Sequence, residues 1–211
     1  MPDSGTFGLF LTAALVLAIT PGPGIFYVLT RSLKGGRAEG VASSLGNALG
    51  GLVHVLAAAL GLSAILMASA TAFTVVKLAG AAYLVYLGIR TLLSRSDGHH
   101  APATSDRPTR SSGAFYQGII AEILNPKTAL FLLAFLPQFV NPQGSVVLQI
   151  VVLGCISVSL NTAADLVVAG FAGTVGRWLR ESARLRRGQR ILTGWALIGL
   201  GAYVALAGEK R

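Results

Sequence analysis

The sequence predicts an all-α polytopic membrane protein of six transmembrane helices, arranged as two inverted three-helix repeats. Three observations lead to this prediction. Hydrophobic residues make up 53% of the 211 residues and charged residues only 12%, whereas soluble domains carry about 25% charged residues. Apolar runs recur six times at lengths suited to about 30 Å of hydrocarbon. Basic residues gather in alternate loops, which indicates that these loops share one side of the membrane.

Six apolar runs follow one another along the chain. Each has close to the length of about 20 residues that a transmembrane helix needs, and the last is the shortest. The first run lacks the basic start and cleavage site of a signal peptide, so we expect it to remain as a span. The expected spans are residues 7–29, 40–67, 73–93, 115–136, 146–172 and 191–206.

Residues 94–113 divide the chain into two halves, 1–93 and 114–211. This segment is rich in Ser, Thr, Pro and Arg and predicts a disordered cytoplasmic linker. Three spans are an odd number, so the second half enters the membrane in the opposite sense, as in inverted-repeat transporters. Short matches in the same order support kinship of the halves: Thr20–Pro23 pairs with Asn125–Thr128, and Leu78–Ala82 with Leu192–Ala196.

The basic residues predict the orientation in a cell inner membrane. The loops after spans one, three and five hold most of the 17 Lys and Arg residues, and the two loops between them hold none. Cytoplasmic loops carry the basic excess, so both termini are expected on the extracytoplasmic side. The residues concerned are Arg31, Lys34, Arg37, Arg90, Arg95, Arg107, Arg110, Arg177, Arg180, Arg184, Arg186, Arg187 and Arg190.

Charge and cysteine content limit the classes of function. The net charge of +9 resides at span ends, which indicates contact with lipid headgroups and no nucleic-acid partner. The single Cys155 excludes a disulfide framework or a two-cysteine site within one chain. His99 and His100 adjoin in the linker and are too few for a metal site. We therefore expect no metal and no cofactor.

Prolines interrupt spans one and four near their middles. Pro21 frees the carbonyl of Leu17 and Pro126 frees that of Glu122, because proline lacks an N–H and displaces the carbonyl four residues earlier. Unpaired backbone at that depth is tolerated only in protein or beside a wet cavity. The interruptions therefore predict a central binding site. The residues expected to form this site at the interruptions are Thr20, Pro21, Gly22, Pro23, Asn125, Pro126 and Lys127.

Polar residues on two other spans are expected to face the same site. Ser157, Asn161 and Asp165 are four residues apart and share one face of span five. Asn47 and His54 share a face of span two. Gly46 and Gly50 on that span form a small-xxx-small pair, which predicts close packing against another helix. We expect Asn47 and Asn161 to contact the substrate.

Ionisable residues inside spans indicate a proton pathway. Charges there cost about 2.5–3.5 kcal/mol on insertion scales, so they need a partner, water or a function. We expect Asp165 and Glu122 to carry protons, Lys127 to act as their counter-charge, and His54 to relay protons. Two structural interpretations stay open. The carboxylates and Lys127 could form an ion-pair network that only holds helices together, and His54 could be a hydrogen-bonded packing residue.

At these residues the chain resembles the lysine exporter / homoserine–threonine resistance (LysE/RhtB) family of bacterial amino-acid exporters. The resemblance implies export of amino acids or close derivatives across the cytoplasmic membrane, driven by protons, with the two proline motifs lining the substrate site. The matching pieces are Thr20–Pro23, Lys77–Leu84 with Gly88, Asn125–Lys127 and Leu136–Phe139.

Two other functions are alternatives to a secondary transporter. A channel or facilitator for small polar solutes can use the same polar residues. A membrane-embedded enzyme would need a pair such as His54 with Ser157, but no G-x-S-x-G elbow is present. The sequence names no particular amino acid and is compatible with a homo-oligomer. Expected partners are an amino acid, protons and membrane lipids.

Overall fold

The computed structural model describes residues 4–20, 22–68, 70–93, 111–141, 144–172, 174 and 183–206. Every regular element among them is helical, which confirms the all-α class. The elements are α1 Ser4–Ile19, α2 Pro23–Ala68, α3 Ala70–Leu93, α4 Ser111–Ile123, α5 Pro126–Leu130, the π-helical turn η1 Phe131–Phe135, the 3-10 turn η2 Leu136–Phe139, α6 Val146–Gly170 and α8 Ala183–Leu206.

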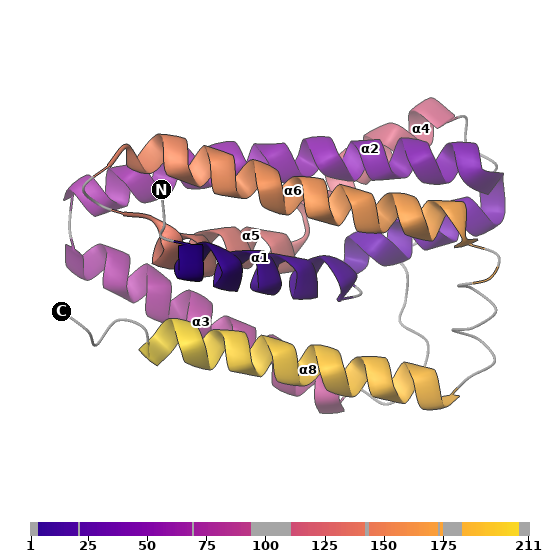
Figure 1. The fold of residues 1–211 in the computed structure, drawn as a ribbon. Coiled ribbons are helices and arrows are strands. Elements are labelled where there is room, and N and C mark those ends of the chain that lie inside the picture. The colour runs from indigo at the N-terminus through magenta and orange to yellow at the C-terminus, as the bar shows by residue number, and fades with distance from the viewer. Residues whose placement is uncertain are drawn as a thin grey trace.

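The helices form two packed groups. Helix α2 packs against α4 and α6, while α3 packs against α8. Figure 1 shows α1 and α5 between the two groups, and α1 begins at the same end of the bundle at which α8 ends. Residues of α1, α2, α3, α6, η1 and η2 build one apolar core. The core thus joins the two groups around the short central elements.

Some of the helices have the length and composition to cross a membrane. Residues 23–61 of α2 and helix α6 do so singly, and α4 with residues 126–139 does so as a pair bent by 45°. Residues 5–19 and 81–93 form shorter apolar helices. Six spans in two inverted repeats remain a prediction. The expected linker is also shorter than 94–113, because residues 111–113 already belong to α4; its remainder, including His99 and His100, lies outside the described residues.

The chain reverses within α2 at Gly36. This glycine has φ 76° and ψ −173°, a backbone conformation that side chains with a Cβ rarely adopt. The segment before it continues the direction of α1, and the segment after it runs back along the bundle (Figure 1). Lys34 and Arg37 are exposed at this reversal. Gly36 is therefore the turn between the first two expected spans.

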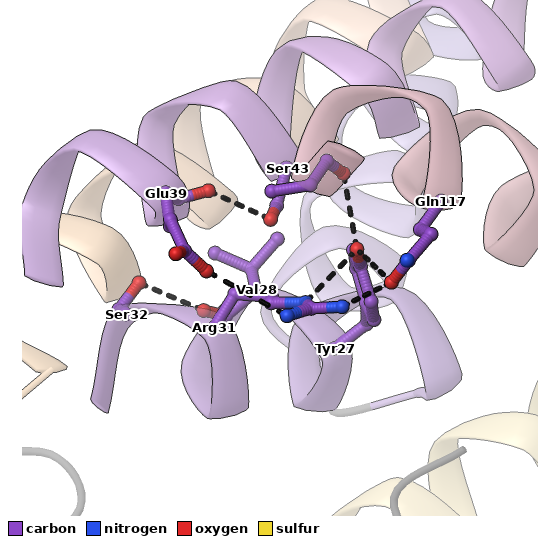
Figure 2. A network of polar contacts seen from close by, with 8 residues as sticks. Tyr27, Val28, Arg31, Ser32, Glu39, Ser43 and Gln117 are labelled. Carbon is purple, nitrogen blue, oxygen red and sulfur yellow. Dashed lines mark hydrogen bonds and ion pairs between the residues drawn. The ribbon is translucent and has the colours of Figure 1, made fainter. Parts of the chain in front are cut away.

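Arg31 corrects the expectation of an exposed basic loop after span one. Its side chain is only 1% exposed and lies inside the bundle. Figure 2 shows its guanidinium between Glu39 and Gln117: Nη1 lies 3.6 Å from Glu39 Oε2, and Nη2 donates to Gln117 Oε1. Nε donates to the Tyr27 hydroxyl at 3.2 Å, which donates to the Ala114 carbonyl at 3.0 Å. The network joins both arms of α2 to α4.

Glycines bring α2 and α4 into backbone contact, as the small-xxx-small pair predicts. A Cβ at Gly46 would collide with the carbonyl oxygen of Phe115, and one at Gly50 would lie 2.8 Å from the carbonyl oxygen of Ile119. From the other side, a Cβ at Gly118 would lie 2.6 Å from the carbonyl oxygen of Ser43. The obstacles are backbone atoms, so the helices themselves would have to separate.

We expect Gly118→Ala to destabilise the protein by about 1–3 kcal/mol, the usual cost of overpacking a tight contact. Gly61→Ala is the control, since a Cβ there meets no described atom within 4 Å and alanine favours helix by up to about 1 kcal/mol. Thermal unfolding of both variants in one detergent measures the effect. Equal stability of the two variants would contradict the close contact.

Candidate functional site

Both predicted interruptions are present. Helix α1 ends at Ile19, and α2 begins at Pro23; Pro21 lies outside the described residues. Helix α4 ends at Ile123, and α5 begins at Pro126. Asn125 caps this new helix, because its Oδ1 accepts a hydrogen bond from the Lys127 amide at 3.1 Å. Proline at the first helical position costs no backbone bond, so the sequence starts α5 there cheaply.

Side chains from other elements satisfy the carbonyls at the interruptions. Lys127 Nζ donates to the carbonyl oxygens of Leu17 at 2.8 Å and Thr20 at 2.6 Å. A cation also stabilises the negative end of the α1 dipole. The Glu122 carbonyl accepts from His54 Nε2 at 2.9 Å and from the Asn125 amide at 2.9 Å. Two carbonyls predicted to be freed, those of Leu17 and Glu122, are therefore the ones that Lys127 and His54 bind.

The Glu122 carboxylate is held by neighbours from its own segment. Asn125 Nδ2 donates to its Oε2 at 2.9 Å, and Thr128 Oγ1 donates to its Oε1 at 2.6 Å. Glu122 is only 7% exposed. Both of its oxygens therefore have a neutral donor, which offsets part of the cost of burying the carboxylate.

Asp165 belongs to α6 and faces α2. Its Oδ2 accepts a hydrogen bond from Asn47 Nδ2 at 2.9 Å, and both residues are about 95% buried. Within the described part of the chain this is the only hydrogen bond of the Asp165 side chain. Asp165 thus has a free oxygen, whereas Glu122 has none.

These groups surround one cavity between α2, α4, α5 and α6. The space between its lining atoms is about 490 Å³, which includes the part at its open mouth. Its lining is Gly22, Gly24, Ile25, Asn47, Ala48, Gly51, Glu122, Asn125, Lys127, Thr128, Leu132, Ser157, Val158, Asn161, Thr162 and Asp165.

Two glycines at the first interruption allow the polar groups to come close. A Cβ at Gly24 would lie 2.9 Å from Glu122 Oε2 and 3.0 Å from Asn47 Nδ2. A Cβ at Gly22 would lie 3.0 Å from Lys127 Cδ. The start of α2 therefore packs directly on the charged groups of the other half of the chain.

The structure brings most of the expected site residues together. Those that line the cavity are Gly22, Asn47, Glu122, Asn125, Lys127, Asn161 and Asp165. Thr20 and His54 do not line the cavity. The Thr20 carbonyl accepts a hydrogen bond from Lys127, and His54 donates one to the Glu122 carbonyl. Pro23 and Pro126 start helices beside the cavity without lining it. Lys127 forms no direct ion pair with either carboxylate among the described residues, so its contacts are those of a helix cap.

Sequence reasoning did not predict that Thr128 donates a hydrogen bond to Glu122. Its signal was present, because an Asn-Pro pair marks a helix start and the third helical residue commonly bonds back to the cap. Asn125 Nδ2 indeed donates to Thr128 Oγ1 at 3.2 Å. Leu132 and Thr162 also line the cavity, and no local pattern distinguishes them.

The chain is similar to known membrane proteins over most of its length. The family model described as LysE type translocator matches residues 15–208. The chain is 30% identical to the uncharacterized membrane protein YrhP of Bacillus subtilis, over 94% of this chain and 97% of that protein. It is 30% identical to a homoserine/homoserine lactone efflux protein of Salmonella typhimurium, over 85% of this chain and 86% of that protein. No solved structure matches significantly.

Proposed function

The chain belongs to the LysE type translocator family, a family of membrane transport proteins and not of enzymes, and we propose that it exports an amino acid or close derivative in exchange for protons. Homoserine and its lactone are the first candidates, because the Salmonella relative is named for their efflux. The proposed site is the cavity around the two interruptions. The basic reversal with Lys34 and Arg37 faces the cytoplasm in this proposal, which leaves both termini outside.

The observation that carries the proposal is the meeting of two buried carboxylates at two broken helices. Glu122 and Asp165 are 7% and 5% exposed and face one polar cavity. A purely structural ion-pair network would join each carboxylate directly to a cation, and neither has such a partner among the described residues. Protonation removes the cost of an unpaired buried charge. This supports a proton-carrying role.

The broken helices around the cavity favour a carrier over a channel. Both interruptions adjoin one polar cavity, where short helix segments can move when the substrate is loaded. Such movement is the basis of alternating access in transporters with broken helices.

Transport by the purified protein in liposomes tests the proposal. We expect L-homoserine to accumulate when the lumen is acidic, with a rate that saturates with concentration and is lost when a protonophore collapses the gradient. Protein-free liposomes under the same gradient are the control. A flux that rises linearly with concentration and ignores the gradient would identify a channel and contradict proton exchange.

A further inference from the structure

Two acceptor oxygens at the cavity have no partner among the described residues. Asn47 Oδ1 is buried without a hydrogen bond, and the second oxygen of Asp165 is likewise free. The Asn47–Asp165 bond of 2.9 Å holds the two groups side by side. Both residues line the cavity and are about 95% buried. A buried acceptor without a hydrogen bond is unfavourable, so Asn47 Oδ1 needs a donor.

The orientation of the Asn47 amide follows from its partner. An ionised carboxylate only accepts hydrogen bonds, so the amide nitrogen must face Asp165. The amide oxygen is then the free atom. Gly24 cannot supply a side-chain donor, and a Cβ at its position would lie 3.0 Å from Asn47 Nδ2. Asn47 and Asp165 both line the cavity, and their two acceptor oxygens lack a donor among the described residues.

Lys127 does not donate to either of these acceptors among the described residues. Two of its three N–H groups donate to the carbonyl oxygens of Leu17 and Thr20 at the end of α1. Among the described residues, the one side-chain ion pair within 4 Å is Arg31–Glu39, outside the cavity. The charged groups facing the cavity are thus two carboxylates and a lysine that donates to the end of α1. His54, the remaining titratable group nearby, binds the Glu122 carbonyl. This arrangement favours a cation.

We propose that Asn47 Oδ1 and the free oxygen of Asp165 bind the primary ammonium group of the substrate, in a site that needs no free carboxylate. The inference deepens the proposed function and depends on it for the identity of the solute. Homoserine and its lactone share a primary amine, and only homoserine has a free carboxylate. Protons and the ammonium group compete for Asp165, which links substrate release to proton uptake.

Ligand stabilisation of the purified protein tests the site without transport. A ligand that binds only the folded state raises the unfolding temperature in proportion to its affinity. The probes are L-homoserine, L-homoserine methyl ester and N-acetyl-L-homoserine, with sodium chloride against choline chloride as a fourth arm. We expect the acid and the ester to bind within about tenfold of each other. We expect N-acetylation to weaken binding by about 100-fold or more, through loss of hydrogen bonds to a charged group.

Variants identify the atoms involved. Asn47→Ala is expected to weaken binding of homoserine and its ester by about 10–100-fold, the effect of one hydrogen bond to a charged donor. Ser44→Ala is the matched control: Ser44 lies on the same helix but does not line the cavity, and among the described residues its hydroxyl donates only to the Gly40 carbonyl of its own helix. Homoserine affinity of the wild type should fall as pH is lowered, because protons occupy Asp165. In Asp165→Asn this pH dependence should disappear.

The outcomes separate the ammonium site from the transport proposal. Equal binding of N-acetylhomoserine and homoserine, stabilisation by sodium in place of the amine, or unchanged affinity in Asn47→Ala would each overturn the ammonium site. Failure of all three solutes to bind would overturn it as well. Ordinary binding of the amines without pH-driven flux would instead contradict only proton-coupled export.

Discussion

Replacing Asp165 by asparagine is expected to abolish transport driven by a pH gradient. The substitution keeps the shape of the side chain, and the amide oxygen of asparagine can still accept from Asn47 Nδ2, which Asp165 Oδ2 now does at 2.9 Å. It removes a group that binds a proton. The bundle should therefore stay folded while accumulation of homoserine in acid-loaded proteoliposomes falls to the level of protein-free liposomes.

Asp165 is favoured over Glu122 as the proton carrier by their hydrogen bonds. Both oxygens of Glu122 accept from neutral donors, Asn125 and Thr128, so a proton on either oxygen must displace or reverse a bond. The free oxygen of Asp165 takes a proton without such a loss. In Glu122→Gln, Thr128 can reverse and donate elsewhere, and we expect slower transport that still follows the gradient.

The two variants form a matched pair, since each replaces a buried carboxylate by its isosteric amide. Full gradient-driven activity in Asp165→Asn would remove this residue from proton coupling. Loss of coupling in Glu122→Gln with its retention in Asp165→Asn would assign the proton to the other carboxylate. Elution of both variants as a single folded species in detergent is the check on folding.

The polar residues of the site could be predicted from the sequence, but not their pairing. Proline chemistry predicts which carbonyls are freed, and a four-residue spacing predicts that Ser157, Asn161 and Asp165 share a face. The partner of a freed carbonyl depends on helix packing. Lys127 donates to backbone oxygens at the end of α1, 107 and 110 residues away along the chain, while its expected role as counter-charge of the carboxylates stays a prediction. Local sequence has no signal for such a contact.

The burial of Arg31 could not be predicted from its neighbours in the sequence. Its neighbours include Lys34, Gly35, Gly36 and Arg37, a composition typical of an exposed basic loop. Burial is decided by Gln117, 86 residues away, and by the return of the chain at Gly36, which brings Glu39 beside the guanidinium. Counting positive charges therefore placed Arg31 with the exposed Lys34 and Arg37, whereas its side chain is buried; the side of the membrane stays a prediction.

Breaking the Arg31–Glu39 pair is expected to produce the largest loss of stability. Glu39→Gln removes the negative charge that lies 3.6 Å from a guanidinium that is 1% exposed, and removing one partner of a buried ion pair costs about 3–5 kcal/mol. Thermal unfolding in detergent measures this loss against the wild type. Arg37→Met is the control: it removes an exposed positive charge from the same reversal, and surface changes usually stay within about 0.5 kcal/mol.

The double variant Arg31→Met/Glu39→Leu decides whether the pair itself stabilises the fold. Replacing a buried ion pair by apolar residues of similar volume is often neutral or stabilising, so we expect the double variant to regain most of the stability lost in Glu39→Gln. Tyr27 and Gln117 limit the recovery, because both lose the guanidinium as a donor. Additive losses in a double-mutant cycle completed by the single variants Arg31→Met and Glu39→Leu would mean that the two charges do not interact. A strongly coupled cycle would instead establish that they stabilise each other, with Arg31 holding the reversal of α2 against α4.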